Sequence, residues 1–256
     1  ENGLKIIEDA NEIVMQDLNF HYPTSQEMNL SQINLKIPKG KTLGIVGKTG
    51  AGKTTLLRQF LRQYPLGEGE FFYGEDRVLS YQRNQVQRLI GYVPQDHVLF
   101  SRRVRDNVAF GKGEATDQEI LDSIKIAAFE EDLLKMDKGL DTMIGEKGVS
   151  ISGGQKQRIS LARALIKNPE ILILDDALSA VDAKTEQEII ANIQRVRANK
   201  TTLISTHRLS AVKEADEIIV LENGQIIERG NHEELLALKG WYYTQYLRQE
   251  LKEGDE

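Results

Sequence analysis

A glycine-rich segment between a short apolar run and a helical pattern constrains the fold of this chain more than any other feature. It has the pattern G-x-x-x-x-G-K-[ST], and its residues are Gly47, Lys48, Thr49, Gly50, Ala51, Gly52, Lys53 and Thr54. The β-branched run Thr42–Val46 precedes it, and apolar residues at helical spacing follow it at 56–61. Glycines let backbone N–H groups turn inward around an anion, and the N-terminus of the helix adds its positive end. The pattern therefore predicts a strand–loop–helix unit that binds nucleotide phosphates.

Two residues at the end of this segment, and the one directly after it, are expected at the nucleotide. Lys53 is placed to reach the β and γ phosphates, and the hydroxyl of Thr54 is a suitable ligand for Mg²⁺. Thr55 follows in the first turn of the helix, and we expect it at the same binding site. A glycine-rich turn without a ligand is the alternative, but the flanking strand and helix favour the phosphate site.

A second apolar run is followed directly by two acidic residues. Ile171–Leu174 is followed directly by Asp175 and Asp176, and ligands of open α/β sheets bind at the carboxyl ends of the strands. Beside a phosphate loop, Asp175 is expected to hold Mg²⁺ through its water shell, and Asp176 to face the water that attacks the phosphate. The alternative is an acidic strand end that caps the next helix.

Short β-branched runs recur along the chain and are separated by loops rich in glycine, polar or acidic residues. They lie at Thr42–Val46, Ile90–Val93, Ile171–Leu174 and Thr202–Ser205. Continuous apolar runs of this length predict a buried parallel sheet. The segment 96–167 is mostly helical in pattern, so we expect it to form an inserted helical subdomain.

The C-terminal part predicts a hairpin and then a helical tail. Asn223-Gly224 separates Glu217–Leu221 from Gln225–Glu228, and both turn residues tolerate the positive φ angles of a tight turn. A mixed helical spacing of apolar residues follows and favours packing of the tail against the core. These residues are Leu235, Leu236, Leu238, Trp241 and Tyr242.

Composition excludes several classes of protein. The net charge of −6 argues against nucleic-acid binding, because phosphate-backbone contacts usually appear as a basic excess. The chain has no cysteine, which excludes disulfides and thiolate metal sites. No stretch approaches the roughly 20 apolar residues of a membrane-spanning helix, so we expect a soluble piece. The sequence begins at Glu1 and not at Met, which favours a piece cut from a longer polypeptide, although processing would give the same start.

One further motif narrows the choice of family. Ser152, Gly153, Gly154 and Gln155 open a helical run, and this segment resembles the signature motif of the ATP-binding cassette (ABC) family. The Ser152 hydroxyl is expected to cap the helix, and the free N–H groups there form a second anion site. The resemblance implies that two cassettes pack head to tail, so that each signature closes over ATP held in the phosphate loop of its partner.

Other short motifs of the ABC family fall in order between residues 13 and 247. Tyr22 is similar to the aromatic residue that stacks on adenine, and Gln95 to the glutamine that touches Mg²⁺ and senses the γ phosphate. Asp182 belongs to a stretch that resembles the loop coupling the two sites across the dimer. His207 is similar to the switch histidine that contacts the γ phosphate.

The resemblance implies an α/β fold with a P-loop NTPase core: a mainly parallel sheet, an antiparallel β subdomain and an inserted helical subdomain. We expect one nucleotide-binding domain over residues 1–256, with the core and its β subdomain at 13–95 and 168–247 and the helical subdomain at 96–167. The implied cofactors are ATP and Mg²⁺. The implied partners are a second cassette and a transmembrane domain on the same native chain, so the domain would lie at the cytoplasmic face of the cell membrane.

Two features refine the expected subfamily. The stretch 145–148 is similar to the exporter-type loop that senses the transmembrane helices of the partner, so export is the expected direction of transport. Arg102 and Arg103 depart from the small residues expected on the surface that faces the membrane domain. A solvated pair or a tuned coupling contact would explain them.

The catalytic residues implied by the resemblance are Lys53, Gln95, Asp176 and His207. The family has Glu where Asp176 stands, so the carboxylate is withdrawn by about 1.5 Å, a displacement that can cost on the order of a hundredfold in rate. We favour a site that binds ATP and hydrolyses it slowly, as in one half of a heterodimeric exporter with a non-identical half-transporter. A small backbone shift that lets Asp176 reach the water is the alternative.

Two other functions stay open. The first is a regulatory nucleotide-binding module that completes the active site of a catalytic partner, which the shortened Asp176 side chain favours. The second is a soluble ABC ATPase of DNA repair or translation, which the exporter-type loop and the acidic balance of the chain disfavour.

Overall fold

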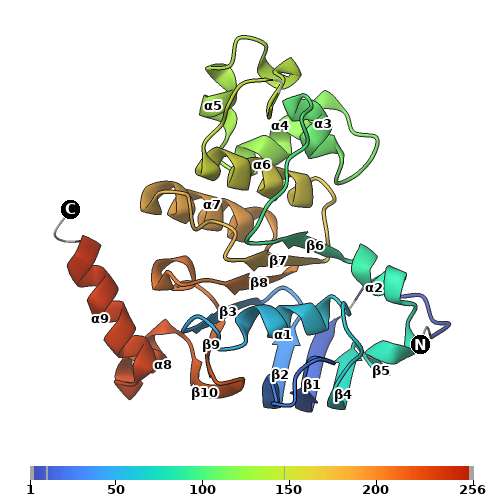
Figure 1. Ribbon diagram of the computed structural model, residues 1–256, viewed down its shortest axis with the longest axis vertical. Helices are drawn as coiled ribbons and strands as arrows, with labels where there is room; N and C mark the ends of the chain where they lie inside the picture. The colour runs from blue at the N-terminus through green and yellow to red at the C-terminus, as the bar shows by residue number, and fades with distance from the viewer. Residues whose placement is uncertain (1–2, 10, 147, 254–256) are drawn as a thin grey trace.

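The larger of two sheets is built from the continuous apolar runs of the sequence. The computed structural model describes residues 3–9, 11–146 and 148–253 (Figure 1). The sheet has the strand order β10-β9-β3-β8-β7-β6, and all its pairings are parallel except β9–β10. Its strands are β3 (Thr42–Gly47), β6 (Ile90–Val93), β7 (Ile171–Asp175), β8 (Thr201–Ser205), β9 (Glu217–Glu222) and β10 (Gln225–Gly230).

The parallel strands are covered on both faces, as their sequence predicts. Every residue of β7 and β8 is buried, which is the pattern of central parallel strands. The hairpin turn between β9 and β10 has positive φ at both Asn223 (49°) and Gly224 (74°). The predicted parallel strands and the predicted hairpin are both confirmed.

A smaller antiparallel sheet lies beside the larger one. Its order is β2-β1-β4-β5, and the burial of β2 alternates along the strand because one face packs inward and the other meets solvent. The strands are β1 (Glu12–Phe20), β2 (Leu30–Pro38), β4 (Glu68–Tyr73) and β5 (Asp76–Arg77), followed by the short helices η1 (Val78–Ser80) and α2 (Arg83–Arg88).

Helix α1 (Lys53–Phe60) lies between the two sheets (Figure 1). Leu56, Leu57 and Phe60 are fully buried in one apolar cluster that also contains Ile33 of β2 and Ile45 of β3. The cluster holds the N-terminus of α1 at the carboxyl end of β3. The glycine-rich loop between them is therefore fixed from both sides.

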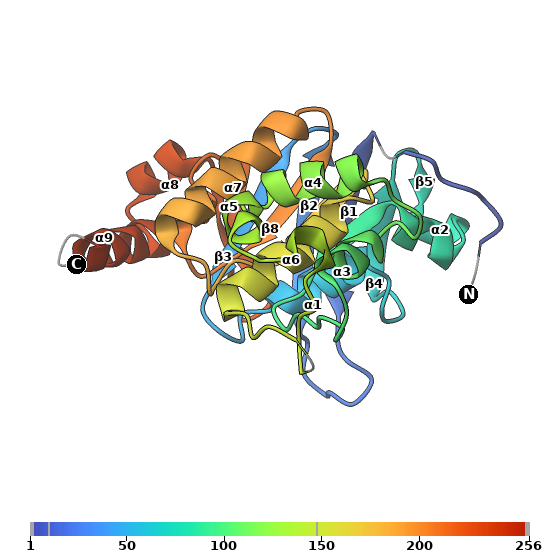
Figure 2. The same cartoon turned by 90° about the horizontal axis from the view of Figure 1, so that it is seen from above.

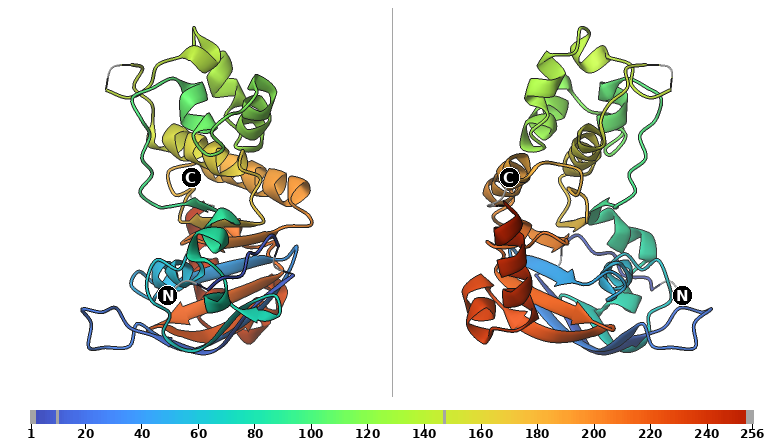
Figure 3. Two further views of the ribbon diagram at one scale, coloured as in Figure 1. Left: turned by 90° about the vertical axis from the view of Figure 1, so that its right-hand side faces the viewer. Right: turned by 60° about the vertical axis from the view of Figure 1, so that its left-hand side comes forward.

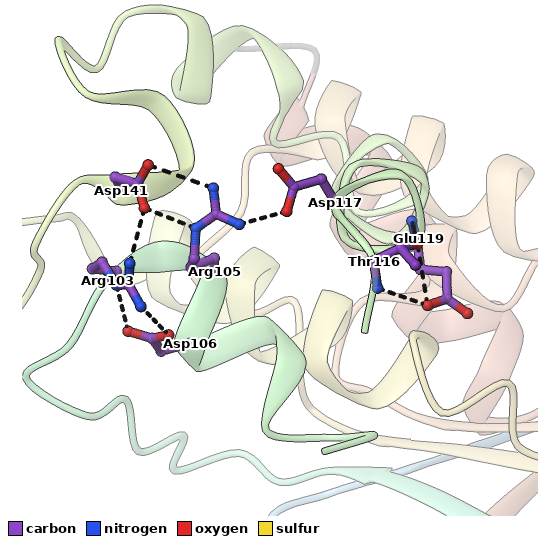
Figure 4. A network of polar contacts seen from close by, with 7 residues as sticks. All are labelled: Arg103, Arg105, Asp106, Thr116, Asp117, Glu119 and Asp141. Atoms are coloured by element: carbon purple, nitrogen blue, oxygen red, sulfur yellow. Dashed lines mark hydrogen bonds and ion pairs between the residues drawn. The ribbon is translucent and has the colours of Figure 1, made fainter. Parts of the chain in front are cut away.

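The segment 96–167 rises above the sheets as a group of helices (Figures 1 and 3). They are α3 (Val104–Ala109), α4 (Asp117–Ile126), α5 (Glu130–Leu134), η2 (Gly139–Asp141) and α6 (Gly153–Leu165). Among the described residues of this segment, β-pairing is limited to isolated bridges such as Arg103 with Met143. Arg102 and Arg103 are both exposed, as expected for a solvated pair, and Arg103 forms ion pairs with Asp106 and Asp141 at the surface (Figure 4).

Helix α7 (Ala183–Val196) packs on one face of the larger sheet, where its Ile189 shares a core cluster with Leu172 of β7. The helices that follow are η3 (Leu209–Ala211), α8 (His232–Leu238) and α9 (Trp241–Glu253). Figure 2 shows α8 and α9 at the end of the molecule opposite to β5. Leu235 and Tyr242 are fully buried, which confirms that the tail packs against the core, whereas Leu238 is 59% exposed. The α/β fold with a mainly parallel sheet is confirmed.

Candidate nucleotide-binding site

A cavity of about 270 Å³ lies where the parallel strands β3, β7 and β8 end. It joins the glycine-rich loop, the acidic end of β7, the segment after β6 and the segment after β8. The predicted residues that line it are Thr49, Gly50, Gly52, Lys53, Thr54, Thr55, Gln95, Asp175, Asp176 and His207. Asn29 and Ser205 complete the lining and were not predicted from the sequence. Parallel pairing explains this meeting, because it brings the carboxyl ends of the strands to one edge.

The loop adopts backbone angles that its glycines permit. Gly50 (φ 81°) and Gly52 (φ 109°) lie in the left-handed region, which L-residues with a side chain rarely adopt. At Gly47 a Cβ atom would lie 2.4 Å from the carbonyl oxygen of Leu221, so no larger residue fits there. The loop conformation therefore requires glycine at these positions. Gly47, Lys48 and Ala51 also belong to the loop but do not line the cavity.

The ammonium group of Lys53 lies within the loop. Its Nζ donates to the carbonyl oxygens of Gly47 at 2.7 Å and Lys48 at 3.1 Å, and the residue is 8% exposed. Burial lowers the pKa of Lys53, and the charges of Asp176 and Asp175 act in the opposite direction. A phosphate group in the cavity would add negative charge and stabilise the charged form of Lys53 further.

Asp175 is held by two neutral donors. Its carboxylate accepts hydrogen bonds from the Thr54 hydroxyl at 3.2 Å and from the Tyr92 hydroxyl at 3.1 Å, and the residue is 3% exposed. Burial raises the pKa of Asp175, the two hydrogen bonds lower it, and the nearby Asp176 raises it. A cation beside such a carboxylate would stabilise its charged form.

These donors suit Mg²⁺ bound together with phosphate. Among the described residues, no group of three or more His, Cys, Asp or Glu side chains forms a metal cage. Mg²⁺ commonly keeps several waters and takes one or two protein ligands beside substrate phosphates. The Thr54 hydroxyl and the Asp175 carboxylate fit that arrangement, and Gln95 lines the same cavity.

Asp176 has an unusual backbone. Its φ angle is 49°, in the left-handed region that non-glycine residues seldom occupy, and its N–H donates to the carbonyl oxygen of Ser205 at 2.8 Å. The side chain lines the cavity and makes no hydrogen bond with another described residue. Strained backbone of this kind is concentrated at functional sites.

The two acidic residues do not cap the following helix. Helix α7 begins at Ala183, and its cap is Asp182, whose carboxylate accepts a hydrogen bond from the N–H of Thr185 at 3.0 Å. The alternative interpretation of Asp175 and Asp176 as a helix cap is therefore wrong. The expected role of Asp182 in coupling two sites stays a prediction.

Tyr22 lies outside the cavity lining, next to the first turn of α1. Its hydroxyl is 2.9 Å from the Thr55 hydroxyl and accepts a hydrogen bond from Arg58 at 3.1 Å. The ring packs edge-on against Phe20 and Tyr64. These contacts fix the ring near the phosphate loop, and its stacking on adenine stays a prediction.

Ser152 caps α6 as predicted. Its hydroxyl accepts a hydrogen bond from the N–H of Gln155 at 3.1 Å, and the Gln155 side chain accepts one from the N–H of Ser152 at 2.8 Å. Ser152 and Gly153 are exposed and do not line the cavity that contains Lys53. The signature segment therefore presents its helix N-terminus to the outside.

Two contacts near the site were not foreseen from the sequence. Tyr92 pairs with Ile173 in the β6–β7 ladder, which places its side chain on the same face as Asp175, two residues further along β7. Gln157 in α6 donates to the Ser179 hydroxyl at 3.0 Å and accepts from the N–H of Ala180 at 2.8 Å. Strand pairing would have revealed the first contact, but no local pattern marks the second.

Comparison with known proteins adds to this geometry. The family model described as ABC transporter matches residues 30–179. The chain belongs to the ABC transporter family. The matched region contains the phosphate loop, Asp175, Asp176 and the signature segment, so the family resemblance of the sequence is confirmed.

Relatives of this ABC chain include two bacterial proteins whose names contain the terms multidrug resistance and ATP-binding. It is 54% identical over 250 residues to "Probable multidrug resistance ABC transporter ATP-binding/permease protein YheI" of Bacillus subtilis (strain 168), covering 98% of this chain and 43% of the relative. It is 44% identical over 239 residues to "Multidrug resistance-like ATP-binding protein MdlA" of Escherichia coli (strain K12), covering 92% and 40%. The ABC chain thus spans less than half the length of these relatives.

A solved structure has the same fold. "Structure of a bacterial Atm1-family ABC exporter with ATP bound" matches with a TM-score of 0.88 and 33% identity, over 97% of this ABC chain and 43% of the other. Within the described residues, none of the helices has the length and apolar character needed to cross a membrane.

The stretch 145–148, which was compared with an exporter-type loop, is described only in part. Lys147 lies outside the described residues, and Glu146 donates its N–H to the Ser101 hydroxyl at 3.3 Å.

Proposed function

We propose that this chain is the ATP-binding and ATP-hydrolysing motor domain of an ABC exporter. The observation that supports it best is the single cavity that combines the phosphate loop with Asp175, Asp176, Gln95 and His207. ATP hydrolysis needs phosphate binding, a metal site and a group that polarises water, and this cavity offers candidates for all three.

Each residue has a distinct task in this proposal. Lys53 binds the β and γ phosphates, and Thr54 and Asp175 hold Mg²⁺ together with Gln95. The bound Mg²⁺ would neutralise negative charge on the phosphates. Asp176 orients and polarises the attacking water, and His207 contacts the γ phosphate.

A second cassette completes the motor. Ser152, Gly153, Gly154 and Gln155 would bind the ATP of a partner, and Asp182 would couple the two sites. The exposed N-terminus of α6, outside the chain's own cavity, supports this arrangement, because a capped helix N-terminus attracts anions.

The motor would act on a transmembrane domain of the same native chain. This rests on relatives named ATP-binding/permease proteins and on an ABC exporter of similar structure, of which this chain spans about 43%. We place the domain at the cytoplasmic face of the cell membrane, with a nucleotide-binding core and β subdomain at 13–95 and 168–247 and a helical subdomain at 96–167. The permease names also speak against a soluble ABC ATPase of DNA repair or translation.

The site of this chain is proposed to be slow, in an assembly with a non-identical half-transporter. Asp176 is one methylene shorter than Glu, and its positive φ already uses a strained backbone, which leaves little room for a compensating shift. A regulatory module, whose ATP stays bound while the partner site turns over, is the second candidate function. It rests on the same residue.

The test is the ATPase rate of the assembled full-length protein with Asp176→Glu. We expect an increase of on the order of tenfold to a hundredfold, because the restored methylene moves the carboxylate toward the water. Lys53→Ala in the same background is the control and should abolish the gained activity and weaken ATP binding. An unchanged rate in Asp176→Glu would contradict the weakened site, whereas a protein that binds no ATP at all would overturn the proposed function itself.

A further inference from the structure

The loop after β8 places His207 at the nucleotide cavity, and among the described residues no hydrogen-bond partner holds its ring. His207 is exposed and lines the cavity, and its imidazole makes no hydrogen bond with any other residue in the described ranges. The backbone of this loop therefore sets the point from which the ring reaches into the cavity. The contacts of that backbone decide where the histidine stands.

One side chain of the C-terminal helix binds this backbone on both sides of Arg208. The Nε2 group of Gln249 in α9 donates to the carbonyl oxygen of His207 at 2.8 Å. Its Oε1 atom accepts a hydrogen bond from the N–H of Leu209 at 2.9 Å. A single amide thus pairs with the C=O of one residue and the N–H of the second residue after it, as a neighbouring strand would.

Helix α9 is itself firmly attached. Tyr242, seven residues before Gln249 and thus on the same face of the helix, is fully buried. Its hydroxyl is 2.7 Å from Nδ1 of His232, and its N–H donates to Glu228 at 3.2 Å. The right view of Figure 3 shows α9 as a straight rod that leads away from α8. Gln249 is therefore presented from a rigid support and not from a free tail.

Other contacts of the loop do not replace this one. Arg208 donates to the carbonyl oxygens of Ser179 and Val181 at 2.9 and 2.6 Å, and its N–H bonds to the Thr206 hydroxyl at 3.0 Å. These contacts fix the residues beside His207. The hydrogen bond to the carbonyl of His207 comes from Gln249.

We propose that Gln249 is a positioning residue for His207, through which the C-terminal helix α9 sets the placement of the switch histidine in the nucleotide site. This inference rests on the proposed ATPase function. The position of α9 would then affect the rate of hydrolysis. A change that shifts α9 along its axis also shifts His207 relative to the γ phosphate, and a misplacement of about 1 Å is enough to reduce a rate strongly.

The first test compares Gln249→Ala with Gln245→Ala in the full-length transporter that carries Asp176→Glu. Gln245 lies one turn earlier on α9, and its side chain makes no hydrogen bond with another described residue, so it is a matched control. The measured quantity is the part of kcat that Lys53→Ala abolishes, together with the KM for Mg-ATP and the melting temperature. We expect Gln249→Ala to lower kcat about tenfold or more with KM within twofold, and Gln245→Ala to leave both unchanged. Equal kcat values in the two variants would overturn the inference.

The second test separates positioning from packing. Gln249→Glu keeps the size of the side chain and its acceptor for Leu209 but faces the carbonyl of His207 without a donor, so we expect a loss of kcat close to that of Gln249→Ala. In the background of His207→Ala, Gln249→Ala should have no further effect on kcat, because its effect passes through His207. A full rescue by Glu, or an equal loss with and without His207, would overturn the proposal even if Gln249→Ala lowers the melting temperature.

The same experiment distinguishes a failure of the proposed ATPase function from a failure of the positioning role of Gln249. If the Asp176→Glu protein has no ATPase activity that depends on Lys53, the proposed function fails. If that activity is present and the Gln249 variants match the starting protein, only the positioning role fails.

Discussion

Burial changes the ionisation of a glutamate that no sequence motif marks. Glu186 in α7 is 2% exposed, and its carboxylate lies 3.4 Å from both Arg208 and the Ser210 hydroxyl. Burial raises the pKa of Glu186 to about 7, and the charge of Arg208 opposes this shift only in part. The group therefore titrates near neutral pH, directly beside the loop that carries His207.

This shift predicts a pH-dependent stability. Between the unfolded pKa of 4.5 and the folded value of about 7, the folded protein binds more protons than the unfolded one, so the free energy of unfolding falls as pH rises through this window. Glu186→Gln removes the effect. We expect the stability of Glu186→Gln relative to wild type to rise by on the order of 3 kcal/mol from pH 4.5 to 7 in denaturant titrations.

A neighbouring glutamate provides the control for this pH series. Glu188 lies on the same helix and is exposed, so Glu188→Gln should run parallel to wild type across the window. If the free energy of unfolding of Glu186→Gln also runs parallel to that of wild type across this pH window, Arg208 keeps Glu186 charged at all these pH values, which contradicts the prediction.

At the scale of elements, ion pairs join the short helices of segment 96–167. Arg105 of α3 donates to Asp117 of α4 at 2.5 Å and to Asp141 of η2 at 2.8 Å, and Arg103 also reaches Asp141 at 3.2 Å (Figure 4). Figure 4 also shows the cap of α4, in which Glu119 accepts from the N–H of Thr116. Helices of five to ten residues are marginal alone, so such links between them matter for their stability.

We expect Arg105→Ala to lower the free energy of unfolding by about 1 kcal/mol, because it breaks two ion pairs of a partly buried network. Salt should reduce this loss, since 1 M salt shortens the screening length to about 3 Å. Denaturant titrations at low and high salt measure both effects. Arg102→Ala is the matched control, because Arg102 is exposed and has no ion pair among the described residues. An equal loss in both variants would show that the network does not stabilise the fold.

At the scale of the whole molecule, a buried arginine links distant segments at the amino-terminal ends of β7 and β8, opposite to the ends that form the nucleotide cavity. Arg197, which follows α7, donates to the carbonyl oxygens of Pro169 at 2.7 Å and Thr201 at 3.0 Å and is 5% exposed. Burial lowers its pKa to about 10, and the charge of Glu170 opposes this shift. Arg197 thereby links the segment before β7 to the start of β8.

Arg197→Ala should be strongly destabilising, by about 3 kcal/mol, because two buried carbonyl groups lose their partner and a cavity remains. The affinity for ATP, measured at a temperature where the variant stays folded, should be unchanged because the site lies at the other end of the strands. Lys200 does not replace the lost contacts, since its ammonium group donates to Asn168 and Glu170. A variant as stable as wild type in denaturant titrations would contradict the proposed tie.

Local sequence determined the elements on which the site is built. The glycine pattern at 47–54, the acidic end of β7, the cap at Ser152 and the hairpin at 223–224 each depend on a few adjacent residues. Short-range sterics, hydrogen bonds to the nearest backbone groups and hydrophobic periodicity act over that distance, so these features can be recognised without a structure.

Tertiary structure alone decided which side chains meet. Asp175 binds Thr54 and Tyr92, which lie 121 and 83 residues away, and Gln249 reaches His207 across 42 residues. These contacts follow from the strand order β3-β8-β7-β6 and from the docking of α9, which depend on the packing of the whole core. No local pattern carries that information, because pairing between distant strands is set by the total burial that it achieves.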